Sequence, residues 1–243
     1  IAQTRTSGLD LASASARRAQ FLLEVYWPLY GAPGSSTNSA PTNPAPASPT
    51  TDGGPVAGNP AGSCAVPAGG QAKDVSRPTT VVGDGTPASC TSAAVVAAVA
   101  NGGVVTFNCG ADPVTITMAA TARIFNNKPD LVLDGGGKVT LSGGGARRIL
   151  YQNSCDQSLV WTTPNCDFQD SPKTTLQNIT FADGNSSGQG YGQREVYGGG
   201  AVFARGGRLA IVNSRFVRNQ CEGSGPDLGG AAVRVREMSG ASP

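Results

Sequence analysis

Residues 83–110 read GDGTPASCTSAAVVAAVANGGVVTFNCG, and this stretch decides the fold of the chain. Thr91 or Ser92 is a suitable N-cap for a helix of alanines and valines, and Asn101 with the two glycines after it is a suitable stop. A strand is predicted over Val104–Asn108, where the residues are β-branched or aromatic. A small-residue helix that leads directly into a short strand indicates a lid on a stack of strands.

The rest of the chain repeats short strand-forming runs that are separated by glycine, asparagine or aspartate. The clearest runs are Val114–Met118, Leu131–Leu133, Val139–Leu141 and Ile149–Tyr151. Strands this short cannot bury enough surface individually, so they must be stacked on one another.

Two internal matches support stacking. LQNITFADGN, which begins at Leu176, matches IVNSRFVRNQ, which begins at Ile211, and GAVFA at Gly200 matches GAAVR at Gly230. Intervals of roughly 30 to 35 residues lie inside the range of repeat architectures, and their inequality predicts coils with loops of different length.

The first internal match predicts which side chains of neighbouring coils lie on one another. It places Asn213 on Asn178 at a bend, and Phe216 on Phe181 in the core. Stacked amides satisfy each other's hydrogen bonds along such a ladder.

The region from about Val81 to Pro243 resembles the right-handed parallel β-helix of the pectate-lyase-like superfamily. Its segments GGGAVFARGG, LAIVNSRFVRNQ and GGAAVRVRE are similar to the glycine–asparagine repeats of secreted and surface β-helix proteins of bacteria. The resemblance implies an all-β solenoid with a short N-terminal capping helix. It implies no single activity, because lyases, hydrolases, adhesins and proteins of no known activity share this fold. The turn spacing leaves an up-and-down antiparallel barrel or sandwich as the alternative.

Six cysteines are present, at Cys64, Cys90, Cys109, Cys155, Cys166 and Cys221. A Cys90–Cys109 disulfide would tie the helical lid to the first strand, and a Cys155–Cys166 disulfide would close a loop. Cys64 and Cys221 then remain, and they could form a third disulfide with one another. No CxxC spacing and no histidine is present, so zinc is disfavoured and disulfides in an oxidising, extracytoplasmic compartment are the better interpretation. Reduced, buried cysteines in a cytosolic protein are the alternative.

Composition divides the chain into a docking segment at 1–34, a linker or extended arm at 35–80 and the β-helix at 81–243. Residues 35–62 consist mainly of proline, serine, threonine, alanine and glycine, with Asp52 as the only charge, and this composition cannot form a core. Such an arm gains order from a surface, which suggests assembly with a protein partner.

Ahead of the arm, residues 7–27 carry apolar side chains at helical spacing. The apolar run is too short to span a membrane, but it could dock on a partner or at a membrane interface. The docking candidates are Phe21, Leu22, Tyr26, Trp27 and Tyr30. Packing on its own domain is equally compatible with the pattern.

The C-terminal residues stop shortly after a predicted strand, without an obvious cap. A β-helix that is open there exposes unpaired backbone, so we expect either further protein or a neighbour to cover it.

The absence of histidine excludes, within this chain, catalytic arrangements that depend on it. A lyase mechanism would need a basic residue to take a proton and a cation, such as calcium, to neutralise a uronate. Its candidates are Arg205, Arg215, Arg218 and Arg234 for the base and Asp156, Asp167, Asp170 and Asp183 for the ion. Asp167 and Asp170 could instead be the paired carboxylates of a glycosidase. Ordinary turn chemistry for these aspartates and outward, solubilising arginines are the simpler interpretation.

A third hypothesis uses the outer face of the solenoid for binding. Its candidates are Arg215, Arg218, Arg234 and Arg236, with Tyr191 and Tyr197 in a glycine-rich loop, and the ligand would be an anionic polysaccharide or a protein. A net charge of +2 argues against a nucleic-acid partner. The function that we expect is therefore non-catalytic: an extracellular or cell-surface structural subunit or adhesin-like binding module, with no cofactor. A polysaccharide lyase or glycosidase is the alternative.

Overall fold

A computed structural model describes residues 65–162, 165–189, 197–223 and 229–236. The docking candidates between Phe21 and Tyr30, as well as Cys64 and Tyr191, lie outside these ranges. By the density of contacts, residues 63–243 form a compact unit separate from residues 1–62.

The described residues form three sheets in which every strand pair is parallel. Sheet A contains β1 (Thr80–Val82), β2 (Gly103–Phe107), β5 (Asp130–Asp134), β8 (Lys173–Gln177) and β11 (Arg208–Val212). Sheet B contains β3 (Val114–Thr117), β6 (Val139–Ser142), β9 (Thr180–Ala182) and β12 (Arg215–Val217). Sheet C contains β4 (Ala122–Ile124), β7 (Leu150–Asn153), β10 (Val202–Arg205) and β13 (Val233–Arg236).

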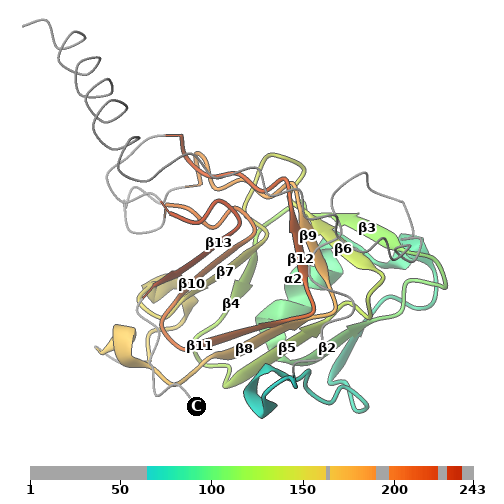
Figure 1. Cartoon of the computed structure of the whole chain (residues 1–243), viewed down its shortest axis with the longest axis horizontal. Helices are drawn as coiled ribbons and strands as arrows, with labels where there is room; N and C mark the ends of the chain where they lie inside the picture. Colours follow the sequence, from blue (N-terminus) through green and yellow to red (C-terminus); the bar gives the residue numbers. More distant parts are fainter. Residues whose placement is uncertain (1–64, 163–164, 190–196, 224–228, 237–243) are drawn as a thin grey trace, which may run out of the picture. The chain divides into compact units, whose positions relative to one another are not determined.

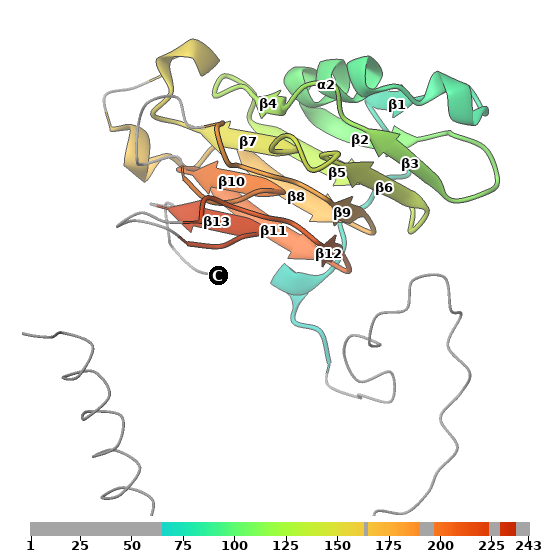
Figure 2. The same cartoon turned by 90° about the horizontal axis from the view of Figure 1, so that it is seen from above.

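From β2 onward the chain visits the sheets in the fixed order A, B, C, and each such set of three strands is one coil. Figure 1 shows the sheets on three sides of the stack, and Figure 2 shows the coils following one another from α2 to β11, β12 and β13. The prediction of a parallel β-helix-like solenoid is confirmed, and the antiparallel alternative is wrong.

The helix α2 (Ser92–Asn101) covers the core at the first coil, as predicted. The Thr91 side chain accepts a hydrogen bond from the Ala94 amide, and the chain leaves the helix at Gly102 with φ 70°. Val95, Ala98 and Val99 are buried against the core. Small residues suit this position because they allow the helix backbone to lie close to the strands.

Two disulfides form, and both are pairings expected from the sequence. Cys90–Cys109, with a Cα–Cα distance of 5.7 Å, joins the segment before α2 to the residues after β2, so it ties the lid to the stack. Cys155–Cys166, at 4.9 Å, closes a loop between β7 and β8. Cys221 forms no disulfide with a described residue, and the Cys64–Cys221 pairing stays a prediction.

The predicted ladder between coils is confirmed. The rings of Phe181 and Phe216 stack at 5.3 Å with an interplanar angle of 14°, and the Asn213 amide donates to Asn178 Oδ1 at 2.8 Å. Both asparagines have positive φ, 51° and 45°, a conformation that asparagine tolerates better than most residues. The asparagines therefore turn the chain from sheet A to sheet B.

The second predicted match is wrong by one residue. Val202 pairs with Val233, whereas the alignment of GAVFA with GAAVR places Val202 on Ala232. The amides of Ala201 and Val202 both donate to the Ala232 carbonyl, at 2.9 and 3.0 Å. Two residues of the β10 coil therefore share one carbonyl of the β13 coil, just before the paired strands begin.

Residues 65–79 belong to the segment predicted as an arm, yet they lie on the outer face of sheet A. Lys73 exchanges two backbone hydrogen bonds with the Gln177 side chain, at 2.8 and 3.0 Å, and the Thr79 amide donates to the Val104 carbonyl at 2.8 Å. The short helix η1 (Ala68–Gly70) contacts β11. These contacts explain why outward-facing Gln177 is buried.

Candidate functional site

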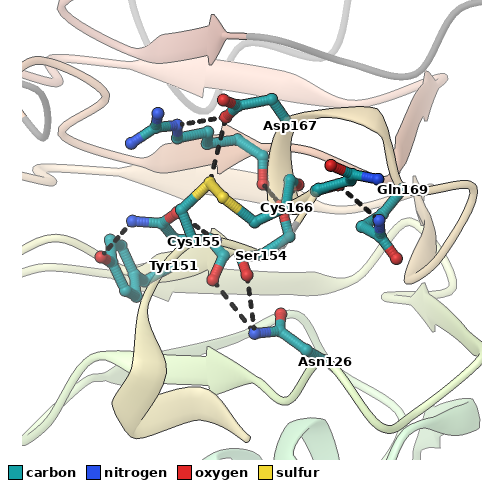
Figure 3. The surroundings of a disulfide bond; sticks show 10 residues. Asn126, Tyr151, Ser154, Cys155, Cys166, Asp167 and Gln169 are labelled. Carbon is teal, nitrogen blue, oxygen red and sulfur yellow. Dashed lines mark hydrogen bonds and ion pairs between the residues drawn. A yellow bond between two sulfur atoms is a disulfide. The ribbon is translucent and has the colours of Figure 1, made fainter. Parts of the chain in front are cut away.

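The loop between β7 and β8, residues 154–172, contains three of the predicted aspartates, Asp156, Asp167 and Asp170, together with the Cys155–Cys166 disulfide (Figure 3). It contains the short helices η3 (Gln157–Leu159) and η4 (Cys166–Phe168). We call it the clamp loop.

Hydrogen bonds fix the base of the clamp loop. The Ser154 hydroxyl lies within reach of the Arg205 carbonyl, at 3.1 Å, and of the Cys166 carbonyl. The Cys155 amide donates to Asn153 Oδ1 at 3.0 Å. The side-chain amide of Asn126 donates to the carbonyls of Asn153 and Ser154, as Figure 3 shows for Ser154. The disulfide is therefore held on both sides by the neighbouring coils.

An apolar cluster anchors the same loop to the outside of sheet C. Leu159 is fully buried with Tyr151 and Phe203, whose rings stack at 5.5 Å. The guanidinium of buried Arg148 lies 5.6 Å from the Tyr151 ring centre and 5.2 Å from that of Phe203. Such cation–π contacts are strongest where water is excluded.

Arg148 also organises the glycine-rich backbone beside this cluster. It donates to the carbonyls of Gly198 and Gly199, at 2.9 and 3.0 Å. Glu222 accepts from the Gly198 amide and the Ser186 hydroxyl, each at 2.9 Å. Burial opposes ionisation of Glu222, but these hydrogen bonds and the charge of Arg148 outweigh it, so the pKa of Glu222 is lowered.

Asp167 and Arg205, two catalytic candidates, form an ion pair. Arg205 Nε lies 3.0 Å from Asp167 Oδ1, and the Arg205 side chain is largely buried. The same carboxylate oxygen is 3.0 Å from Cys155 Sγ, a contact without a hydrogen bond because a disulfide sulfur carries no proton. An arginine that acts as a base must lose its proton, and a paired carboxylate opposes that loss.

Asp170 is paired in the same way. It contacts Arg208 Nε, and Lys173 Nζ lies 3.1 Å away. Hydrogen bonds from Arg208 and then Lys173 lower the pKa of Asp170. A general acid needs a raised pKa, so this environment favours a structural role for Asp170 over an acid of a glycosidase pair.

The four aspartates predicted as calcium ligands do not converge. Asp156 accepts from the Ser158 amide and hydroxyl and from the Tyr151 hydroxyl, as a helix cap. Asp183 lies after β9, where Arg218 donates to both its oxygens at 2.7 and 3.0 Å. Within the described ranges, the one cluster with metal-ligand spacing is Cys155, Cys166 and Asp167, and its two sulfurs are joined in a disulfide.

The arginines predicted for binding lie on two sheets. Arg215 begins β12, and Arg218 follows that strand in sheet B. Arg234 and Arg236 lie on β13 in sheet C, in register with Phe203 and Arg205. Of the two tyrosines predicted for binding, the structure describes Tyr197, which is half-buried.

The sequence interpretation missed the apolar side chains that the clamp loop exposes. Phe168 is 79% exposed and Trp161 44%, and Val160 before it has φ 68°, a strained conformation for a β-branched residue. The backbone around Phe168 is anchored, because its neighbour Asp167 pairs with Arg205 and the nearby Asp170 pairs with Arg208. The sequence signal for this exposed pair was the presence of two aromatic residues, Trp161 and Phe168, in or beside a loop closed by two cysteines.

The fold and this loop define the class of protein as a disulfide-stabilised parallel β-solenoid with one short capping helix. Comparisons with family models, curated proteins and solved structures each find no match. The two disulfides indicate an oxidising compartment. Among the described helices, none combines the length and apolar character needed to cross a membrane.

The lowered pKa values predict acid sensitivity. Asp170, Asp183 and Glu222 all bind protons more weakly when folded than when unfolded, so their stabilisation is complete above the unfolded pKa and is lost as the pH falls through the folded pKa. We expect a lower free energy of unfolding at about pH 3 than at about pH 6, measured by urea denaturation.

Arg218→Gln should reduce that pH dependence, because the Arg218 hydrogen bond is the main cause of the Asp183 shift. Exposed Arg77 provides the control, since the Arg77→Gln variant should keep the wild-type pH profile. An Arg218→Gln profile identical to wild type would contradict this assignment.

Proposed function

We propose that this protein is a non-catalytic, extracytoplasmic member of the pectate-lyase-like right-handed β-helix superfamily. It acts as a binding or structural subunit at the cell surface, and its N-terminal segment attaches it to a larger assembly. The parallel solenoid and the two disulfides support the superfamily and the location. The tether is supported by the composition of the first 62 residues.

The observation that carries the proposal is the clamp loop. A disulfide and two ion pairs anchor the backbone around Phe168, whose side chain is 79% exposed. Ordering a loop when a ligand binds costs backbone conformational entropy. A loop that is already anchored beneath an exposed aromatic side chain avoids that part of the cost, which is a property expected of a binding platform.

The same contacts count against the lyase. Arg205 is occupied by Asp167, and Asp170 is occupied by Arg208 and Lys173. Arg215, another of the four candidate bases, lies on β12 in sheet B, whereas Arg205 lies on β10 in sheet C.

A direct assay separates these functions. The full chain, incubated with polygalacturonate or alginate and calcium, should release no unsaturated uronate, as measured by ultraviolet absorbance. Steady release of that product, abolished by Arg205→Ala or Arg215→Ala, would replace our proposal with the lyase.

The tether is tested by fractionation of producing cells. The full chain should sediment with the envelope, and a chain that begins at Ser63 should appear in the soluble fraction. The compact unit 63–243 provides the boundary for this deletion. Equal sedimentation of both forms would remove the N-terminal segment from the proposal.

A further inference from the structure

The coil formed by β11, β12 and β13 exposes core residues that are buried in the coil above it. Ile211 is 38% exposed, but its register partner Leu176 is 0% exposed, and Val235 is 49% exposed against 0% for its partner Ala204. Each of these three strands is also the last in its sheet within the described residues (Figure 2). The described solenoid therefore presents an apolar, hydrogen-bonding end.

The two ends of sheet C differ in their cover. At one end, β4 is packed against the capping helix α2. At the other, β13 has β10 as its strand neighbour, and the described short helix η1 lies instead against β11. Of β11 and β13, β13 is thus the edge better placed to accept another strand.

The residues of β13 specify what such a strand would need. Val233 packs against the core, and the register with β10 places Val235 on the inward-facing Ala204 column. Arg234 and Arg236 alternate with these valines and belong to the outward face. A complementary strand would therefore alternate two kinds of residue. Its inward-facing residues would be apolar, and its outward-facing residues would interact favourably with arginine.

The charge of the last coil indicates which outward-facing residues the added strand would carry. The last coil carries five arginines, Arg208, Arg215, Arg218, Arg234 and Arg236, whereas Glu222 is the one acid among described residues 208–223 and 229–236. Arg208 and Arg218 contact acids of the preceding coil, Asp170 and Asp183. On sheet C, Arg236 lies in register beside Arg205 instead. Acidic outward residues in the next layer would therefore offset the like charges that meet there, as the acids do for Arg208 and Arg218.

We infer that the exposed edge of β13 binds, by strand addition, an extended segment of a partner protein in which apolar residues alternate with acidic ones. Main-chain hydrogen bonds supply affinity in this mode, and the alternating side chains supply specificity. A second copy of this chain fits less well, because two such ends would bring arginine against arginine.

The test uses the full chain and two fluorescent probe peptides, one built on a Val-Glu repeat and one on a Val-Lys repeat. Fluorescence anisotropy should show about tenfold tighter binding of the Val-Glu peptide, since opposite cross-strand charges replace like charges. A Val-Glu peptide with proline in place of the central valine should lose binding, because proline cannot donate to the ladder. This peptide tests strand addition without altering the protein.

Charge exchange at the edge supplies the second test. Arg236→Glu should reduce the preference for the Val-Glu peptide at least about fivefold. The matched control is Arg123→Glu, which changes the same residue type on the same sheet but on β4, at the α2 end. Arg123→Glu should leave peptide binding unchanged.

Three results would overturn the inference. They are equal binding of both peptides or of neither, an unchanged preference in a folded Arg236→Glu variant, and retained binding of the proline peptide. Self-association of the peptide-free chain that Arg236→Glu alters, measured by sedimentation velocity, would assign the edge to a second copy instead.

Discussion

Replacing Phe181 with alanine is expected to lower the free energy of unfolding by about 3–5 kcal/mol. Phe181 is fully buried on β9, between Leu141 of the coil above and Phe216 of the coil below. Deleting the ring removes its apolar burial and the stacking on Phe216, and leaves a cavity that the strands cannot close without losing their register. Urea denaturation at neutral pH measures the change.

Phe216 is the matched control, because it occupies the same column one coil further on. It is only partly buried at the open end, so Phe216→Ala should cost about half as much as Phe181→Ala. Equal losses would mean that Phe216 is as well covered as Phe181, which would contradict an accessible last coil.

Several elements of the fold could be predicted because their signals are local. The cap α2 carries its own N-cap at Thr91 and its own stop at Gly102. The Asn178–Asn213 and Phe181–Phe216 ladders lie in segments of equal length between neighbouring coils, so a sequence match found the true register. The β10–β13 match failed because the run of glycine and alanine before each strand can be aligned in neighbouring registers, and the structure uses the one that places Val202 on Val233.

The contacts of the candidate site depended on long-range geometry that sequence spacing does not encode. Asp167 and Asp170 were recognised as candidates, but their partners, Arg205 and Arg208, lie one coil away. Residues 65–79 have linker composition and still lie on sheet A, because their contacts use backbone groups such as those of Lys73. Backbone contacts of this kind leave little trace in residue identity.

Arg148 illustrates the same limit, because the pair Arg147–Arg148 after a glycine run gives no hint that its second member is buried. Its side chain is 1% exposed, donates to the carbonyls of Gly198 and Gly199, and lies over the rings of Tyr151 and Phe203. These contacts connect the glycine-rich backbone to the aromatic cluster under the clamp loop. Arg148 therefore holds together two parts of the candidate site that are distant in sequence.

Arg148→Met should therefore lower the free energy of unfolding by about 3–5 kcal/mol, the range for removing one member of a buried charged network. Methionine keeps an unbranched apolar stem but leaves the two glycine carbonyls without this donor and Glu222 without its nearby positive charge. The pKa of Glu222 should rise, so the variant should also lose a component of its acid sensitivity. Arg147→Met is the control, since Arg147 is half-buried and its hydrogen bond to the Ala119 carbonyl is exposed, so this change should cost about 1 kcal/mol or less. Equal losses in the two variants, in urea denaturation, would contradict the central place of Arg148 beneath the clamp loop.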